Sequence, residues 1–274
     1  MLTVESYFKD IVSDKPISVL RCGNVEVTSL LQEPKQISEV YSQMFTNAGF
    51  YGSYDDYIAW EVEYMNALKN MDYFLDVVSC GSFVICGELL IKNNIYCNML
   101  PYIENIDHWI NLLLYLKKNN KKICIVSFFA KEMKQQYKII DKIFEKHNLT
   151  NIDIEFVETP STIKGNDLHT GWNETYEDIK SKLGKSNSDI YLLSCGCYGL
   201  PLCNFIKTNL KKTSIYAGAL LQMMFGLKGK RWEERALMNK YYNSYWKYPN
   251  RKPKNFSDVE QGCYWGKEQQ SDKP

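Results

Sequence analysis

The chain has 274 residues, of which 45% are hydrophobic and 24% are charged, and its formal net charge is +1. This composition excludes an intrinsically disordered chain, which would combine low hydrophobicity with high net charge. The near-neutral balance also excludes a general electrostatic attraction to nucleic acid or to an anionic membrane. Any anion site must therefore be a local cluster of cations.

The cysteines and the apolar segments bear on the cellular compartment. The nine cysteines are an odd number, and the first ten residues carry Glu5, Lys9 and Asp10 in place of an apolar leader. Both features favour free thiols in a reducing, cytoplasmic compartment. The longest apolar runs, such as Ile110 to Leu116, are far shorter than the ~20 residues that cross a bilayer. We therefore expect no integral membrane segment.

Strand-like and helical segments alternate along the chain. Short apolar runs typical of buried parallel strands lie at 17–20, 74–78, 123–129, 152–156, 189–194 and 214–217. Helical patterns lie between them, at 27–31, 54–69, 106–118, 130–147, 173–183 and 201–210. This alternation predicts an α/β fold of the Rossmann-like kind, with a mainly parallel sheet flanked by helices.

The chain shows no internal repeat and no Gly/Ser-rich or Pro-rich linker in its middle. We therefore expect a single domain over 1–265, with 266–274 as a flexible tail. Residues 241–265 are rich in Tyr, Trp and Pro and predict an irregular wrap over the surface. Asp55 and Asp56 fall where a helix should begin and are explained as helix N-terminal charge.

Ligands of open parallel sheets bind where strands end and turn into helices. The first such turn reads Arg21-Cys22-Gly23-Asn24-Val25-Glu26. An arginine there can bind a phosphate or carboxylate, a glycine permits a tight turn, and the carboxylate of Glu26 can meet a metal or a sugar hydroxyl. The alternative is that Arg21 and Glu26 form a buried ion pair which only braces the turn.

The second turn follows the predicted strand 189–194 and includes Gly196, Tyr198 and Gly199, with Pro201 at a helix start. The two glycines would let the backbone approach a ligand, and Tyr198 could stack on a nucleobase. Cys195 and Cys197 lie too close together, with no matching pair, for a zinc site, so buried packing is the favoured interpretation.

The third segment carries three cations within four residues, namely Lys228, Lys230 and Arg231. Two glycines are interspersed among them, and the loop could wrap a diphosphate. It lacks the glycine spacing and the Ser or Thr of a Walker loop. A solvated charge run is the alternative, but the flanking Phe225 and Trp232 favour a loop that packs down on the protein. His108, His147 and His169 lack the spacing of a zinc helix.

Taken in order, these segments resemble the GT-D type glycosyltransferases of bacterial and giant-virus surface-polysaccharide biosynthesis. The turn Arg21 to Glu26 is similar to the family's Arg-Phe-Gly-Asp-Gly-Glu, its Asp-x-Glu signature, and the resemblance covers most of the chain. The other similar segments are Ser127 to Glu132, Ser194 to Leu202, Gly218 to Trp232, Asn243 to Trp246, and Glu260 to Trp265.

The resemblance implies a Rossmann-like domain that takes a sugar from a nucleotide-sugar donor, with a UDP-sugar favoured, to a glycan or related acceptor. It also implies a Mn²⁺ or Mg²⁺ ion held by Glu26 and the residue at position 24. That residue is Asn24 where the family has aspartate, and an amide binds a hard cation less well than a carboxylate. Ser127 and Ser244 also depart from the family pattern. No oligomeric state is predicted.

The predicted catalytic residues are Glu26, as base or sugar-hydroxyl ligand, with Arg21, Lys230 and Arg231. The predicted clamp for the leaving diphosphate consists of Lys228, Lys230 and Arg231, and Arg21 and the backbone at Gly196 and Gly199 assist it. Two alternatives remain open, another Rossmann-type transferase such as a methyltransferase, and a non-catalytic nucleotide-binding partner in polysaccharide assembly. The predicted donor-binding residues are Gly23, Asn24, Ser127, Glu132, Gly196, Tyr198, Gly199, Gly218, Gln222, Lys228 and Trp232.

Overall fold

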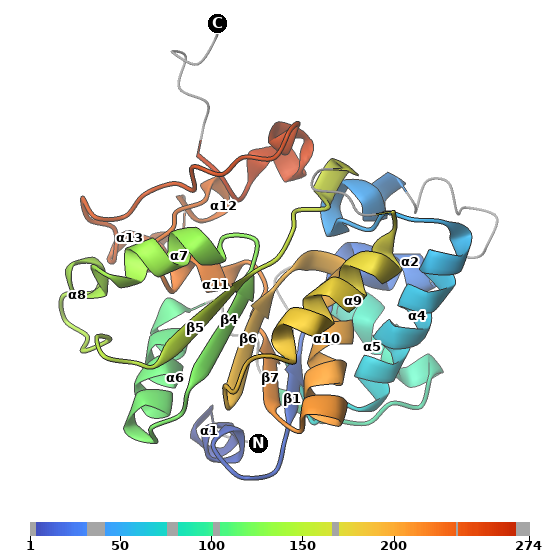
Figure 1. Cartoon of the computed structure of the whole chain (residues 1–274), viewed down its shortest axis with the longest axis horizontal. Helices are drawn as coiled ribbons and strands as arrows, with labels where there is room; N and C mark the ends of the chain where they lie inside the picture. The colour runs from blue at the N-terminus through green and yellow to red at the C-terminus, as the bar shows by residue number, and fades with distance from the viewer. Residues whose placement is uncertain are drawn as a thin grey trace, which may run out of the picture.

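The computed structural model describes residues 4–31, 42–75, 82–100, 105–165, 170–233 and 235–266. Its centre is a seven-stranded sheet in the order β3-β2-β1-β7-β6-β4-β5, in which every strand pair is parallel (Figure 1). Helices cover both faces of this sheet. The predicted α/β, Rossmann-like class is therefore confirmed.

Six of the seven strands overlap the runs predicted from the sequence, and β3 was missed. β3 is a three-residue strand at the edge of the sheet, and its Asn98 and Met99 are exposed. It therefore lacks the continuous apolar run that marks a buried strand. The strands are β1 (Ser18–Leu20), β2 (Tyr73–Leu75), β3 (Asn98–Leu100), β4 (Ile123–Ser127), β5 (Ile154–Glu158), β6 (Ile190–Ser194) and β7 (Thr213–Tyr216).

The helices form two layers, one on each face of the sheet (Figure 1). One layer contains α1 (Val4–Ile11), α6 (Ile106–Lys118), α7 (Ala130–Tyr137), α8 (Ile140–Ile143) and α11 (Leu220–Met223). The other contains α2 (Asn24–Leu31), α4 (Tyr54–Lys69), α5 (Ser82–Lys92), α9 (Trp172–Leu183) and α10 (Gly199–Phe205), with the π-helical turns η2 (Met44–Ala48) and η6 (Ile206–Leu210). No helix in the described ranges is long and apolar enough to span a membrane.

The chain direction explains which helix covers which face. Crossovers that run toward the β3 edge pass over the face of α2, α4, α5, α9 and α10, whereas those toward the β5 edge pass over the face of α6, α7 and α8. All the crossovers therefore have the same hand, as the strong preference for right-handed βαβ units requires.

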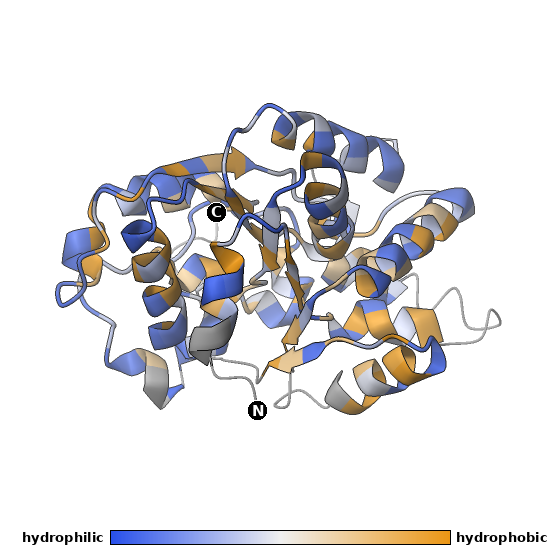
Figure 2. Ribbon diagram, turned by 90° about the horizontal axis from the view of Figure 1, so that it is seen from below, coloured by the Kyte–Doolittle hydropathy of each residue, from blue (hydrophilic) through white to orange (hydrophobic). Residues whose placement is uncertain are grey.

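The core consists of two apolar layers separated by the sheet. In β4, Ile123 and Ile125 contribute to the cluster on the α6 face, whereas Cys124 and Val126 contribute to the cluster on the α4 face. This alternation follows from the two-residue period of a strand. Figure 2 shows apolar residues on the strands and on the helix faces that meet them. Because both faces of the sheet are buried, the strands are continuous apolar runs in the sequence.

Local sequence signals explain where the longest helices begin and end. Asp55 and Asp56 lie in the first turn of α4, as predicted, and Ser53 and Asp56 form a reciprocal capping box at its start. Asp56 also accepts a hydrogen bond from the Asn173 amide at 3.1 Å, which ties α4 to α9. The single helix predicted over 130–147 is divided into α7 and α8. The division follows Tyr137, whose hydroxyl bonds the backbone of Ile152.

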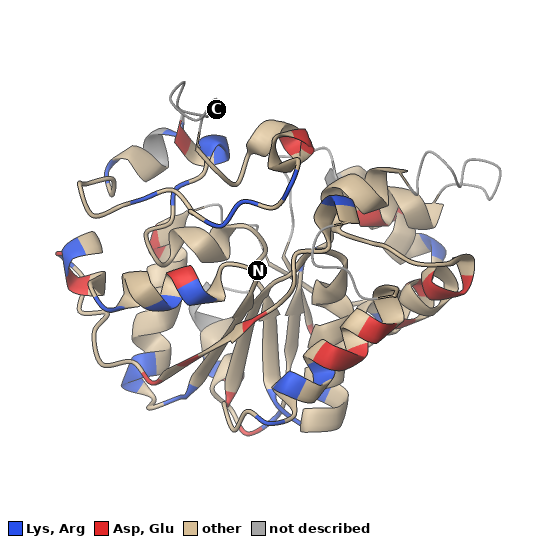
Figure 3. Cartoon of the chain, turned by 45° about the horizontal axis from the view of Figure 1, so that its top comes forward, with Lys and Arg blue, Asp and Glu red and all other residues tan. Residues whose placement is uncertain are grey.

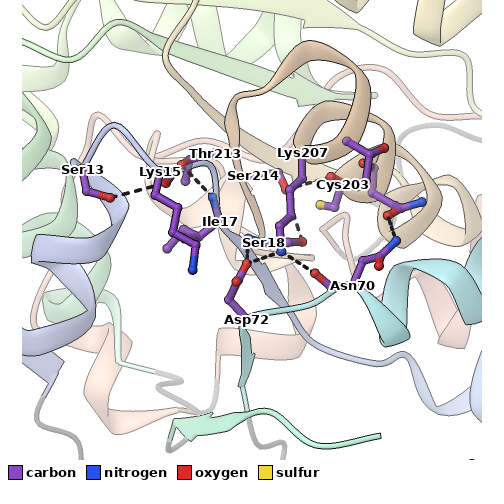
Figure 4. Close-up of polar contacts among 12 residues, drawn as sticks. Ser13, Lys15, Ile17, Ser18, Asn70, Asp72, Cys203, Lys207, Thr213 and Ser214 are labelled. Carbon is purple, nitrogen blue, oxygen red and sulfur yellow. Dashed lines mark hydrogen bonds and ion pairs between the residues drawn. The ribbon is translucent and has the colours of Figure 1, made fainter.

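The amino-terminal edge of the central strands is braced by a polar cluster (Figure 4). Asp72 accepts a hydrogen bond from the Ser18 amide at 2.8 Å and forms an ion pair with Lys207 at 2.6 Å. Lys207 also donates to the Asn70 carbonyl at 2.5 Å. These contacts fix β1 and β2 relative to η6, which follows α10, at the edge opposite the carboxyl ends of the strands.

The C-terminal segment, residues 230–266, contributes to the core and does not only cover the surface. Trp246, Val259 and Trp265 are at most 5% exposed and belong to the core cluster. The Trp265 indole donates to the Arg251 carbonyl at 2.9 Å. The segment includes α12 (Lys230–Glu233), α13 (Ala236–Asn239) and the 3-10 turns η7 (Phe256–Asp258) and η8 (Glu260–Gly262), and it passes over the carboxyl ends of the strands (Figure 1). Most of the predicted tail, 267–274, lies outside the described residues.

Candidate functional site

A cavity of about 370 Å³ opens at the carboxyl ends of the strands. Its walls come from the turns after β1, β4, β5, β6 and β7, and the C-terminal segment closes one side. This is the edge at which open parallel sheets bind ligands. Eleven of the residues predicted for the site line the cavity: Arg21, Gly23, Asn24, Glu26, Ser127, Gly196, Tyr198, Gly218, Gln222, Arg231 and Trp232.

The turn after β1 brings Glu26 back toward the strand end. A Cβ atom at Gly23 would lie 2.0 Å from Glu26 Oε2, so this position has no room for a side chain. Glu26 is only 7% exposed although it lines the cavity. Burial raises the pKa of Glu26, and its own backbone amide and the positive charge of Arg21 oppose that rise. The turn therefore presents a buried carboxyl beside a guanidinium.

The Arg21 guanidinium is packed between Tyr216, the last residue of β7, and Gly218 in the turn that follows. Gly218 has a positive φ of 60°, and a Cβ there would lie 2.9 Å from Arg21 Nη1. On another side, the guanidinium lies 6.0 Å from the centre of the Tyr216 ring. Two turns that are almost 200 residues apart in sequence thus meet at Arg21, because β1 and β7 are neighbours in the sheet.

The glycines after β6 serve different purposes. Gly196 has a φ of 55°, and a Cβ there would lie 2.4 Å from the Ala48 carbonyl oxygen, so this cavity wall requires glycine. Gly199 does not line the cavity and makes room for the Tyr216 ring, which would lie 2.1 Å from its Cβ. Tyr198 lines the cavity, but it is 3% exposed and its ring stacks on Trp172 at 5.9 Å.

Of the two cysteines of this turn, Cys197 is buried, whereas Cys195 is half-buried and lines the cavity. Burial raises the pKa of Cys195 to about 12 and that of Cys197 well above its usual range. Neither thiol is therefore prepared for nucleophilic chemistry at neutral pH. The interpretation as packing residues agrees with this environment.

The three cations of the basic segment 228–231 do not all face the cavity. Arg231 lines the cavity, pairs with Glu260 and lies over the Tyr264 ring at 5.1 Å. Lys228 and Lys230 are not among the described residues that line it. The Lys228 ammonium lies 5.1 Å from the centre of the Tyr242 ring, in a cation–π contact outside the cavity. Figure 3 shows basic residues near the C-terminal segment, with charges of both signs elsewhere on this side.

Backbone contacts determine which cation of this segment reaches the cavity. Gln222 donates from its side chain to the carbonyls of Lys228 at 3.0 Å and Tyr264 at 3.1 Å, and the Lys230 amide donates to Trp265 O at 3.0 Å. At Gly229, a Cβ would lie 2.9 Å from the Cys263 carbonyl oxygen. Gln222, predicted to bind the donor, therefore organises the segment at the edge of the cavity.

Two other predicted donor-binding residues lie in or near α7. Ser127 ends β4, lines the cavity and accepts a hydrogen bond from the Phe129 amide at 3.2 Å. Glu132 lies outside the cavity lining. Its carboxylate accepts from the amides of Asn250 at 2.9 Å and Arg251 at 3.0 Å, and so holds the C-terminal segment. Arg251 in turn lies over the Phe128 ring at 4.0 Å.

The predicted metal ligands provide a poor donor set. Asn24 and Glu26 both line the cavity, but no group of three or more His, Cys, Asp or Glu side chains suited to a metal occurs in the described ranges. A hard divalent cation takes several oxygen ligands, and the positive charge of Arg21 acts on the Glu26 carboxylate. No chemical step is therefore assigned to a metal below. His169, noted in the sequence, lies outside the described residues.

No family model, curated protein or solved structure matches this chain. The resemblance to GT-D glycosyltransferases therefore depends on the sequence segments alone.

Several lining residues were not predicted. They are Asn47 to Gly49 in and after η2, Thr159 to Ile163 after β5, and Arg235, Glu260 and Tyr264 in the C-terminal segment. The polar run Thr159-Pro160-Ser161-Thr162 follows a predicted strand and could have been found by the same rule that found the other turns. No signal in the sequence near residue 47 connects it to the cavity, because that wall is formed by tertiary packing.

Proposed function

We propose that this protein is a glycosyltransferase that moves a sugar from a nucleotide diphosphate sugar, favouring a UDP-sugar, to a glycan or related acceptor. The observation that carries the proposal is the gathering of Arg21, Arg231 and a buried Glu26 in one cavity at the carboxyl ends of parallel strands. The motif resemblance and the α/β fold support it.

Sugar transfer builds positive charge at the anomeric carbon and negative charge on the departing diphosphate. The reaction needs cations that stabilise the leaving group and a base that accepts the proton of the acceptor hydroxyl. Arg21 and Arg231 are the proposed cations, with Arg235 on the same wall. Glu26 is the proposed base. Burial raises its pKa, and the positive charge of the neighbouring Arg21 limits that rise.

Lys228 and Lys230 have different proposed roles from Arg231. Their ammonium groups are not among those that face the cavity, and Lys228 packs against tyrosine rings. The clamp proposed here therefore consists of arginines from two segments. An arginine fork can bind two phosphate oxygens at once, which suits this task.

The test is a binding and turnover panel on the purified full chain. UDP-sugars, GDP-sugars and S-adenosylmethionine are compared by thermal shift, and donor hydrolysis is measured with and without Mn²⁺. We expect stabilisation by a nucleotide sugar and release of the nucleoside diphosphate. Stabilisation by S-adenosylmethionine alone would indicate a methyltransferase. Binding of nucleotide without hydrolysis or transfer, under either condition, would indicate a non-catalytic partner.

A further inference from the structure

The cavity has two chemically different ends. Its charged lining residues are Arg21 and Glu26 after β1, and Arg231, Arg235 and Glu260 in the C-terminal segment. One part of the uncharged wall, which we call the neutral end, consists of residues 47–49, 127–129 and 159–163. Among the residues that the structure describes, the lining of the neutral end includes no Asp, Glu, Lys or Arg.

The turn after β1 and the segment after β5 lie apart along the sheet. Arg21 follows β1 and Thr159 follows β5, and the sheet order places three strands between them. Four inter-strand steps of ~4.8 Å correspond to about 19 Å. A diphosphate bound at Arg21 would not fill this distance, so a ligand that extends from Arg21 to Thr159 carries a further, uncharged group toward β5.

The neutral end is held in place by hydrogen bonds within the protein. The Thr159 amide donates to the Ser127 carbonyl at 3.2 Å, which continues the ladder between β4 and β5. The Thr162 hydroxyl donates to the Gly49 carbonyl and joins this segment to the end of η2. Gly49 has a φ of 75°, and a Cβ there would lie 2.8 Å from the Thr162 hydroxyl. The wall is thus pre-organised.

One hydroxyl in this wall is an exception. Thr159 is 2% exposed and lines the cavity, and its Oγ1 has no hydrogen-bond partner in the part of the chain that the structure describes. Buried hydroxyl groups are normally paired, because an unpaired one loses its bonds to water without replacement. Phe128, half-buried in the same wall, offers an aromatic ring whose packing against Arg251 fixes it.

From these observations we infer that the neutral end is a nucleoside subsite, in which the Thr159 hydroxyl bonds the heterocyclic base and Phe128 packs against it. This inference rests on the proposed use of a nucleotide donor. It assigns base recognition to the segment after β5, whereas the sequence suggested Tyr198, whose ring stacks on Trp172 instead. Neutral hydrogen-bonding groups and aromatic rings are the usual partners of a base.

The test compares Thr159→Val with Thr159→Ser in the full chain, using isothermal titration with UDP, GDP and inorganic pyrophosphate. We expect Thr159→Val to weaken binding of the preferred nucleoside diphosphate about tenfold and to leave pyrophosphate binding unchanged. Thr159→Ser retains the hydroxyl and should bind nearly as the wild type does. Thr208→Val, outside the cavity lining, is the matched control, and thermal unfolding reports whether each variant is folded.

The possible failures are distinguishable. Tight nucleotide binding by the wild type that Thr159→Val leaves unchanged, or an equal loss of pyrophosphate binding, would overturn the nucleoside subsite alone. Should Thr159→Val fail to fold, Phe128→Leu takes its place, with the same expected selectivity between nucleotide and pyrophosphate. A folded wild type that binds no nucleotide would overturn the proposed function, and the subsite with it.

Discussion

The turn after β1 and the basic segment 228–231 both bring cations to the carboxyl edge of the sheet, but they are built differently. Arg21 is packed between Tyr216 and Gly218, beside a buried carboxyl, and the whole turn lines the cavity. In the basic segment, only Arg231 of the three cations lines it. The path of the backbone through this segment is fixed by hydrogen bonds from the amides of Lys228 and Lys230 to the carbonyls of residues 247 and 265.

The difference teaches that the burial of a group, and not the local density of charge, distinguishes the end of the cavity at which we propose the reaction. The pKa of a buried carboxyl next to an arginine depends strongly on its burial and on the arginine's charge. A cation on a half-exposed loop is largely solvated and pairs with whatever carboxylate is near. Three substitutions can break or sharpen this contrast.

The largest effect is expected from Glu26→Gln, which removes the proposed base while keeping the shape of the side chain. We expect turnover to fall about 1,000-fold, with donor affinity nearly unchanged. The wild-type rate should be lost as the pH falls through the pKa of Glu26, because the base must be ionised. Burial raises that pKa, so the loss should begin at a higher pH than for an ordinary carboxyl.

The pH profile has its own control in Arg21→Gln. Removing the guanidinium takes away a charge that lowers the pKa of Glu26, so the acid limb of kcat should move to still higher pH. Rates measured between pH 4 and pH 9 at saturating donor would show both changes. An acid limb that Arg21→Gln leaves in place would contradict the coupling of these two residues.

The second effect concerns the clamp. Arg231→Ala should lower turnover about 100-fold, because a positioned cation that stabilises the leaving group is lost. Lys228→Ala is the matched control from the same segment. It should leave turnover within about twofold and destabilise the protein by about 0.5–1 kcal/mol, the usual value of an exposed cation–π contact. Steady-state kinetics and urea unfolding measure the two quantities. Equal losses of turnover in both variants would show that the segment acts as one unit.

Much of the fold was predictable because its strands are buried on both faces. Runs such as 123–129 and 189–194 contain only apolar or small residues over most of their length, and β4 and β6 lie within them. β3 escaped prediction because Asn98 and Met99 are exposed at the sheet edge. The break between α7 and α8 has no signal in the helical periodicity; it follows Tyr137, whose hydroxyl bonds the backbone of Ile152, a contact that periodicity does not encode.

The residues of the site were predictable where glycines or charged residues directly follow a predicted strand. Arg21, Gly23 and Glu26 come directly after β1, and Gly196 comes directly after β6. Glu132 and Lys228 were plausible by residue type, but the C-terminal segment engages both, through backbone amides and through tyrosine rings respectively. Residues such as Asn47 and Glu260 reach the cavity from elements outside the strand turns. Only the packing of the chain brings them there.

The smallest effect tests how Arg231 is held before a ligand arrives. Glu260 pairs with Arg231 at the cavity wall, and η8 holds it there with positive φ values of 45° at Glu260 and 57° at Gln261, which are uncommon for residues with side chains. An anionic ligand must compete with this carboxylate. Glu260→Gln should therefore tighten pyrophosphate binding about fivefold, as expected for a partly exposed ion pair.

The control for Glu260→Gln is Glu233→Gln, since Glu233 bonds the Tyr248 hydroxyl and does not line the cavity. Titration at low and moderate salt should show the gain shrinking as salt rises, because screening weakens the pair that the ligand replaces. Weaker pyrophosphate binding by Glu260→Gln would mean that Glu260 positions Arg231 for the anion. In that case Glu260 would hold Arg231 in place for the ligand, as the close packing of Gly218 holds Arg21.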